Sequence, residues 1–258
     1  MNLNLSFDST RQQYRVKGGQ PGAGQFVKKT AVRDIIDADR VAQKERLGGH
    51  NERLKLMAQR FKDGVLSEEE FRGEVAIWNR RRKRVIAAAN LNYAAAGRGG
   101  IEQMDKSAYG RAGATIKFHY EASNGFADDI IENPDIVLGT VAGKMDFEKR
   151  SDMAVDTALF SFLNEQALSH SENGYTRYRN VPHSQESCQS SKTKPGCDEI
   201  TEVDWQAINS LPAHGTRACG PKCECGWEYD KGSLDEIEPF EFVGMKSVSF
   251  YDHAAGLY

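Results

Sequence analysis

The chain has 258 residues, of which 39 % are hydrophobic and 28 % are charged, and its formal net charge is −3. This length allows a sizeable core in one large domain or two smaller ones. No apolar run reaches the length of a membrane span, and the first residues lack the pattern of a signal peptide. We therefore expect a soluble, helix-rich protein that is made and assembled in the cytosol, where thiols stay reduced.

The charges are distributed unevenly along the chain. Residues 1–150 contain 26 lysines and arginines against 20 aspartates and glutamates, whereas residues 151–258 contain 8 against 17. A basic first half and an acidic second half indicate different surroundings for the two halves. Ordinary fluctuation in composition is the alternative interpretation.

Residues 1–27 have the composition of an extended arm. The stretch KGGQPGAGQF at 17–26 is rich in glycine, which frees the backbone, and contains a proline, which opposes helix. We expect this arm to become ordered against a partner. A frayed chain end is the alternative.

Residues 28–174 are predicted to form a helical domain. Apolar residues at three- and four-residue spacings predict helix over 28–62. The sequence GGH at 48–50 is expected to divide this segment into two helices, because glycine is a poor helix former.

The next helix has a clear start signal. Ser67 followed by Glu70 has the pattern of a capping box, in which the side chain of each residue accepts from the backbone N–H of the other. We predict a helix over 67–96, ended by the glycine-rich sequence GRGG at 97–100.

Two further helices are predicted, over 105–132 and 144–170, joined by a connection at 132–145. The fold class is therefore mainly α: a helical bundle with an extended arm before it. His119, between Phe118 and Tyr120, is interpreted as a residue of the core or of a groove.

Residues 175–230 are predicted to form a separate cysteine-rich module, because helical periodicity is lost and all five cysteines occur here. A segment of this size cannot build a large core and needs a staple. The remaining residues, 231–258, form a C-terminal tail with a short alternating stretch that suits a strand.

The spacing of the cysteines suits a tetrahedral zinc site, which takes four ligands from two turns. The expected quartet combines the first three cysteines with one of the last two, and His214 is a substitute ligand. Such a closed site would be structural, and its binding energy would help to fold the module. Reduced cysteines without metal, or a disulfide formed after release from the cell, are the alternatives. The candidate ligands are Cys188, Cys197, Cys219, Cys223 and Cys225.

The helices are followed by RYRNVPHSQESCQS at 177–190, a spacer, and GTRACGPKCECGWEY at 215–229. This order resembles the minor head, or head-morphogenesis, proteins of tailed bacteriophages. The family's terminal Cys-x-Cys signature is matched by Cys223 and Cys225. Its upstream C-x2-C pair is matched only at Cys188, because residue 191 is a serine, so Cys197 would supply the missing thiolate. Weaker resemblance extends over 14–27 and 64–100.

The resemblance implies a virion structural protein without enzymatic activity, assembled in the host cytoplasm. It would be a minor, oligomeric component near the portal vertex or inside the shell, in contact with the portal or major capsid protein, and would aid capsid assembly or DNA packaging and ejection. The alternatives are a head–tail adaptor ring and a zinc-dependent or toxin-like enzyme.

Five basic residues follow one another in WNRRRKRV at 78–85, and on a helix they cannot share one face. One interpretation is a solvated helix face with ion pairs to nearby glutamates. The other is non-specific contact with DNA phosphates or with an acidic partner. The candidate contact residues are Arg80, Arg81, Arg82, Lys83 and Arg84.

The sequence lacks three motifs that are typical of nucleotide-binding or hydrolytic sites. The glycine-rich stretch at 17–26 does not have the GxxxxGK[ST] pattern of a phosphate-binding loop. Neither an HExxH pair nor a GxSxG nucleophile motif occurs in the chain.

Overall fold

In a computed structural model, the described part of the chain is mainly helical with two small sheets, which confirms the expected fold class at this level. No helix in the part of the chain that it describes is both long and apolar enough to cross a membrane. The residues described are 5–8, 13–16, 26–27, 29–141, 145–181, 205–210 and 225–232.

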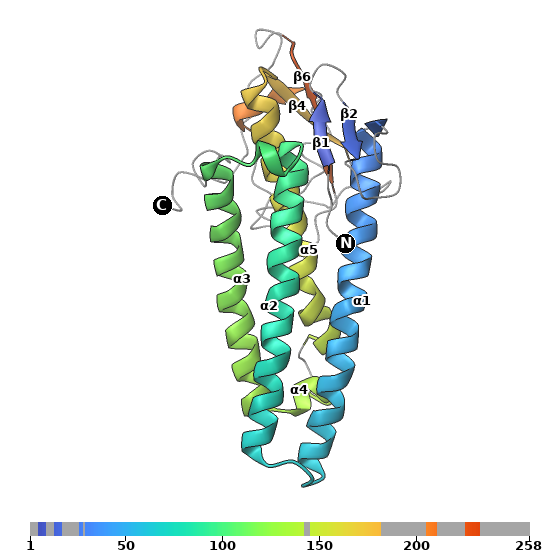
Figure 1. The fold of residues 1–258 in the computed structure, drawn as a ribbon, viewed down its shortest axis with the longest axis vertical. Helices are drawn as coiled ribbons and strands as arrows, with labels where there is room; N and C mark the ends of the chain where they lie inside the picture. The colour runs from blue at the N-terminus through green and yellow to red at the C-terminus, as the bar shows by residue number, and fades with distance from the viewer. Residues whose placement is uncertain are drawn as a thin grey trace, which may run out of the picture.

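Four long helices lie side by side along the molecule, and both sheets lie at one end of the rod (Figure 1). Helix α2 lies between α1 and α3 and packs most extensively against α5. The short helix α4 lies at the end opposite to the sheets (Figure 1). The helices are α1 (Lys29–Lys62), α2 (Glu68–Arg98), α3 (Lys106–Glu132), α4 (Asp135–Leu138) and α5 (Phe147–Glu172), with a 3-10 turn η1 (Ile101–Gln103).

Helix α1 runs without interruption through GGH at 48–50, so the predicted break is wrong. A glycine inside a helix costs only about 1 kcal/mol relative to alanine. The buried side chains on either side, Leu47 and Leu54, anchor both halves of α1 in the bundle. Packing therefore outweighs the weak local preference.

The capping box before α2 is present as predicted. The Ser67 hydroxyl accepts from the backbone N–H of Glu70 at 3.3 Å, and the Glu70 carboxylate accepts from the backbone N–H of Ser67 at 2.8 Å. The helix ends in the predicted glycines, where Gly99 has a left-handed backbone with φ of 93°.

The two remaining long helices are confirmed close to their predicted bounds. Asp105 caps α3 by accepting from the backbone N–H of Ala108 at 2.7 Å, and this hydrogen bond holds the pKa of Asp105 below its ordinary value. Asp146 caps α5 in the same way, through the N–H of Lys149 at 3.1 Å.

Within residues 1–27, the described segments pair with one another as an antiparallel sheet of order β1-β2-β3. Leu5 faces Val16 across the first pair, and Tyr14 faces Val27 across the second. These segments are extended, as expected of the arm, but the strands with which they pair belong to the same chain. The strands are β1 (Leu5–Asp8), β2 (Gln13–Val16) and β3 (Phe26–Val27).

The second sheet, of order β5-β4-β6, comes from the cysteine-rich segment. Tyr178 of β4 and Trp227 of β6 pack edge to face, with ring centroids 5.4 Å apart, in the same buried cluster as Tyr93 and Phe162 of the helices. The described strands of this segment therefore share the core of the bundle. The strands are β4 (Arg177–Val181), β5 (Gln206–Ala207) and β6 (Gly226–Asp230).

Helices α2 and α5 lie close together at Gly97. A Cβ atom at this position would lie 2.3 Å from the carbonyl oxygen of Phe162 and 2.9 Å from the backbone nitrogen of Gln166. Both neighbours are backbone atoms of α5 and cannot rotate away. The absence of a side chain at Gly97 thus sets how closely the two helices pack.

Substitution Gly97→Ala is expected to lower the free energy of unfolding by about 1–3 kcal/mol, because the helices must separate to admit the methyl group. Gly73→Ala is the matched control, since Gly73 lies on the same helix and nothing lies within 4 Å of its Cβ position. The control should stabilise the protein by about 0.5–1 kcal/mol through helix propensity. Urea unfolding measures both changes. Equal effects of the two substitutions would contradict the close approach.

Candidate functional site

Of the five candidate zinc ligands, only Cys225 lies among the described residues. It is buried, with 9 % of its surface exposed, directly before β6. In the described parts of the chain, no group of three or more histidine, cysteine, aspartate or glutamate side chains could hold a metal ion. Cys188, Cys197, Cys219 and Cys223 lie outside those parts, so the zinc site remains a prediction.

The basic run on α2 divides between the interior and the surface. Arg82 is buried, with 4 % of its surface exposed, whereas Arg80 and Arg84 are exposed and Arg81 and Lys83 are half-buried. Successive residues of a helix are about 100° apart, so one member of such a run must face the bundle. Arg82 therefore does not lie on the surface at which a nucleic acid would be contacted, and contact by the other four residues remains a prediction.

Arg82 joins three helices from inside the bundle. Its Nη1 donates to the hydroxyl of Ser123 on α3 at 2.6 Å. Its Nη2 donates to the carbonyl oxygens of Ser151 at 3.3 Å and of Arg150 at 3.5 Å, both on α5. The guanidinium also lies 5.6 Å from the ring centroid of Phe126.

The hydrogen bonds around Arg82 belong to a polar layer that reaches α1. Asn51 of α1 accepts from the indole N–H of Trp78 at 2.9 Å and from the hydroxyl of Ser151 at 3.1 Å. Ser123 in turn donates to the side-chain oxygen of Asn79 at 2.6 Å. All four long helices therefore meet in one hydrogen-bonded layer.

Arg82 carries its charge without a carboxylate partner in the described part of the chain, since all its hydrogen bonds there go to neutral oxygens. Burial, and then the positive charge of Arg150, lowers the pKa of Arg82 to about 10. The side chain stays protonated at neutral pH. Its role in the bundle is structural rather than one of ligand binding.

His119 lies in the interior, as expected from its apolar neighbours in sequence, with 7 % of its surface exposed. Burial, and then the charge of Arg82, lowers the pKa of His119 to about 4. Its Nε2 lies 3.3 Å from the hydroxyl of Thr157. The imidazole is neutral at physiological pH, which fits a core residue.

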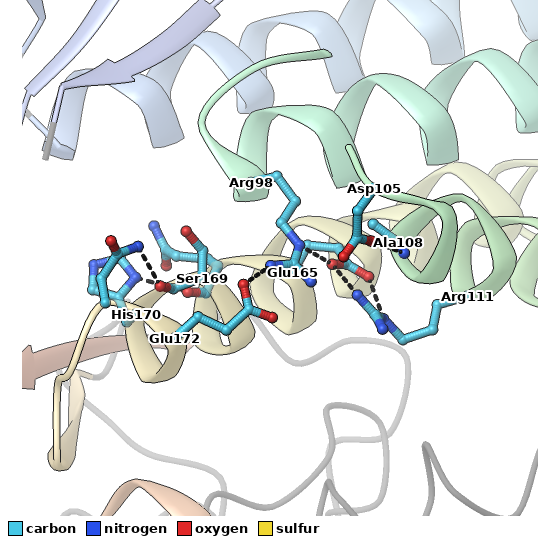
Figure 2. A network of polar contacts seen from close by, with 10 residues as sticks. Arg98, Asp105, Ala108, Arg111, Glu165, Ser169, His170 and Glu172 are labelled. Carbon is cyan, nitrogen blue, oxygen red and sulfur yellow. Dashed lines mark hydrogen bonds and ion pairs between the residues drawn. The ribbon is translucent and has the colours of Figure 1, made fainter. Parts of the chain in front are cut away.

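A second buried network lies near the end of the bundle that carries the sheets. Figure 2 shows Arg98 and Arg111 converging on Glu165, with Glu172 beside Arg98. Arg98 Nε lies 2.7 Å from one oxygen of Glu165, and Arg111 donates to both oxygens, at 2.7 and 2.8 Å. Arg98 also pairs with Glu172. Glu165 and Arg98 are almost fully buried.

Burial would lower the pKa of Arg98, but the hydrogen bonds and charges of Glu172 and Glu165 together raise it above its ordinary value. Both oxygens of Glu165 accept from an arginine, so the carboxylate is fully engaged. This network was not predicted from the sequence. It ties α2, α3 and α5 together and leaves the Glu165 carboxylate no free oxygen for acid–base chemistry.

The end of α5 connects this network to the cysteine-rich segment. His170 stacks on Tyr229 of β6, with ring centroids 4.2 Å apart, and packs edge to face on Tyr175 at 4.8 Å. The His170 Nδ1 lies 2.7 Å from the carbonyl oxygen of Gln166 (Figure 2 shows His170 on α5). The strand that follows Cys225 is thus fixed to the helical rod.

On the outer side, α1 and α2 form a shallow hollow around His50 and Arg81. Arg53 of α1 donates to both oxygens of Glu74 of α2, at 2.9 and 3.2 Å. Burial, and then the charge of Arg81, lowers the pKa of His50. Among the predicted contact residues, Arg81 is thus the one that lines this hollow together with residues of α1.

The chain matches no family model, no curated protein and no solved structure. These comparisons therefore do not test the expected relation to phage minor head proteins, which remains a prediction from the sequence.

Proposed function

We propose that this protein is a structural component of a tailed-phage virion, a minor head or head-morphogenesis protein near the portal vertex. It would aid capsid assembly or DNA packaging and ejection. The observation that carries the proposal is the segment GTRACGPKCECGWEY at 215–229, which resembles the end of the cysteine module of that family.

The position of this segment supports a structural role. The side chain of Trp227, two residues after the last cysteine, is 5 % exposed and belongs to the core of the helices. Tyr229 stacks on His170 at the end of α5. A module fixed in this way would form a rigid knob at one end of the bundle.

The shape of the bundle is also suited to contact with neighbouring subunits. Helix α1 has 34 residues, which at 1.5 Å per residue gives a rod about 50 Å long. Such a rod offers long lateral surfaces to a portal or capsid protein. The partners proposed here are the portal or major capsid protein of the same particle.

The proposal predicts that the protein is present in purified particles of the phage that encodes it. Quantitative mass spectrometry of gradient-purified virions measures its presence and its copy number relative to the portal. A copy number equal to that of the portal, in a ring below it, would favour the head–tail adaptor instead. Absence from mature particles and from purified procapsids would overturn the proposal.

We also propose that the cysteine module holds one structural zinc ion. Its only described ligand candidate, Cys225, is buried, as a structural ligand should be. Elemental analysis of protein purified without chelator should find about one zinc per chain, and Cys219→Ser should lose the metal and unfold the module. His214→Gln should retain the metal if four cysteines bind it. Substoichiometric zinc together with a Cys188–Cys219 disulfide would contradict the assignment.

A further inference from the structure

The outer face of α1 and α2 carries arginines that have no carboxylate partner among the described residues. Elsewhere in the described chain most arginines form ion pairs, among them Arg72, Arg98 and Arg150. Arg46 donates only to the neutral Gln43, at 3.3 Å. Within the described range, Arg80, Arg81 and Arg84 form no ion pair with any carboxylate.

The register of the two antiparallel helices brings these arginines together. The Arg53–Glu74 ion pair and the Asn51–Trp78 hydrogen bond fix which residues lie opposite one another. His50 and Arg81 line the same hollow. One turn further along each helix, about 6 Å away, Arg46 and Arg84 follow.

Lys83 belongs to a different side of α2. Its Nζ donates to the side-chain oxygen of Asn124 at 2.5 Å and lies 5.3 Å from the ring centroid of Tyr120, both on α3. The five-residue run therefore supplies one buried side chain, one side chain held against α3, and three arginines on or next to the face shared with α1.

We infer that the face formed by Arg46, His50, Arg80, Arg81 and Arg84 binds the phosphate backbone of double-stranded DNA without reading its sequence. This inference deepens the proposed function, because it names the packaged genome as the partner of one surface. Arginine forks match phosphate oxygens in pairs, whereas lysine acts as a point charge.

A regular polyanion is favoured over an acidic protein by the layout of the face. The hollow is shallow, and the carboxylate among its lining residues, Glu74, is paired with Arg53. The four arginines of the face have no ion pair of their own within the described residues. They are spread over two helices rather than gathered around a pocket for one side chain. On each strand of DNA a phosphate recurs about every 3.4 Å of helix axis. Phosphates can therefore lie opposite arginines that are spread over such a surface, whatever the position of the duplex along its axis. His50, whose pKa is lowered, adds a hydrogen bond rather than a charge at neutral pH.

The test is the salt dependence of DNA binding by the full-length protein, measured by fluorescence anisotropy with a 30-base-pair duplex of arbitrary sequence. Four phosphate contacts predict a slope of log K against log salt of about −3.6, which is a roughly 100-fold loss of DNA affinity between about 50 and about 200 mM salt. In the triple variant Arg46→Gln/Arg80→Gln/Arg84→Gln, the DNA affinity should fall only about 4-fold over that range. A second duplex of unrelated sequence should bind equally well.

A charge-matched control removes three exposed basic side chains elsewhere, in Arg60→Gln/Lys106→Gln/Lys117→Gln, and should retain the steep slope. Urea midpoints equal to that of the unmodified protein show that both triple variants are folded. Equal loss of slope in both variants, or no loss in either, would overturn the inference. Tighter binding to poly-aspartate than to DNA, lost in the first variant, would assign the face to an acidic protein. None of these outcomes affects detection of the protein in particles, which tests the proposed function separately.

Discussion

The burial of Arg82 is the constraint on which the arrangement of the bundle depends. An ionised side chain inside a protein costs several kcal/mol unless its donors are satisfied. Here hydroxyl and carbonyl oxygens of α3 and α5 accept from Nη1 and Nη2 of Arg82, and aromatic rings of Trp78 and Phe126 lie within 6 Å of its guanidinium. The Nε of Arg82 is buried and has no hydrogen-bond partner among the described residues. A rotation of α2 by one residue, about 100°, would turn Arg82 away from these acceptors.

The rotation of α2 also decides which residues face outward. With Arg82 inside, Arg80 and Arg84 are exposed, and Arg81 lies beside His50 at the boundary with α1. The same helix lies close to α5 at Gly97, and the next residue, Arg98, pairs with Glu165. The packing of α2 against α5 thus positions both the basic face and the described strands of the cysteine-rich segment.

The sequence predicted those features whose causes are local. The capping box needs only Ser67 and Glu70, three residues apart, and it was found from them. The break expected at 48–50 was wrong because burial of Leu47 and Leu54 outweighs the glycines. The division of the basic run and the pairing of Glu165 with Arg98 depend on residues far apart in the chain, and no local pattern distinguishes Arg82 from its neighbours. The predicted zinc ligands lie mostly outside the described residues, so their arrangement remains a prediction.

The most direct test compares the free energy of unfolding of Arg82→Gln with that of Arg80→Gln, two equal substitutions on one helix. Glutamine at 82 cannot reach both α3 and α5 and loses hydrogen bonds of a buried charged group, so we expect a loss of about 2–4 kcal/mol. At position 80 the side chain is exposed, and the change should stay within about 0.5 kcal/mol. Equal losses at the two positions in urea unfolding would contradict the division of the run into a buried residue and a surface.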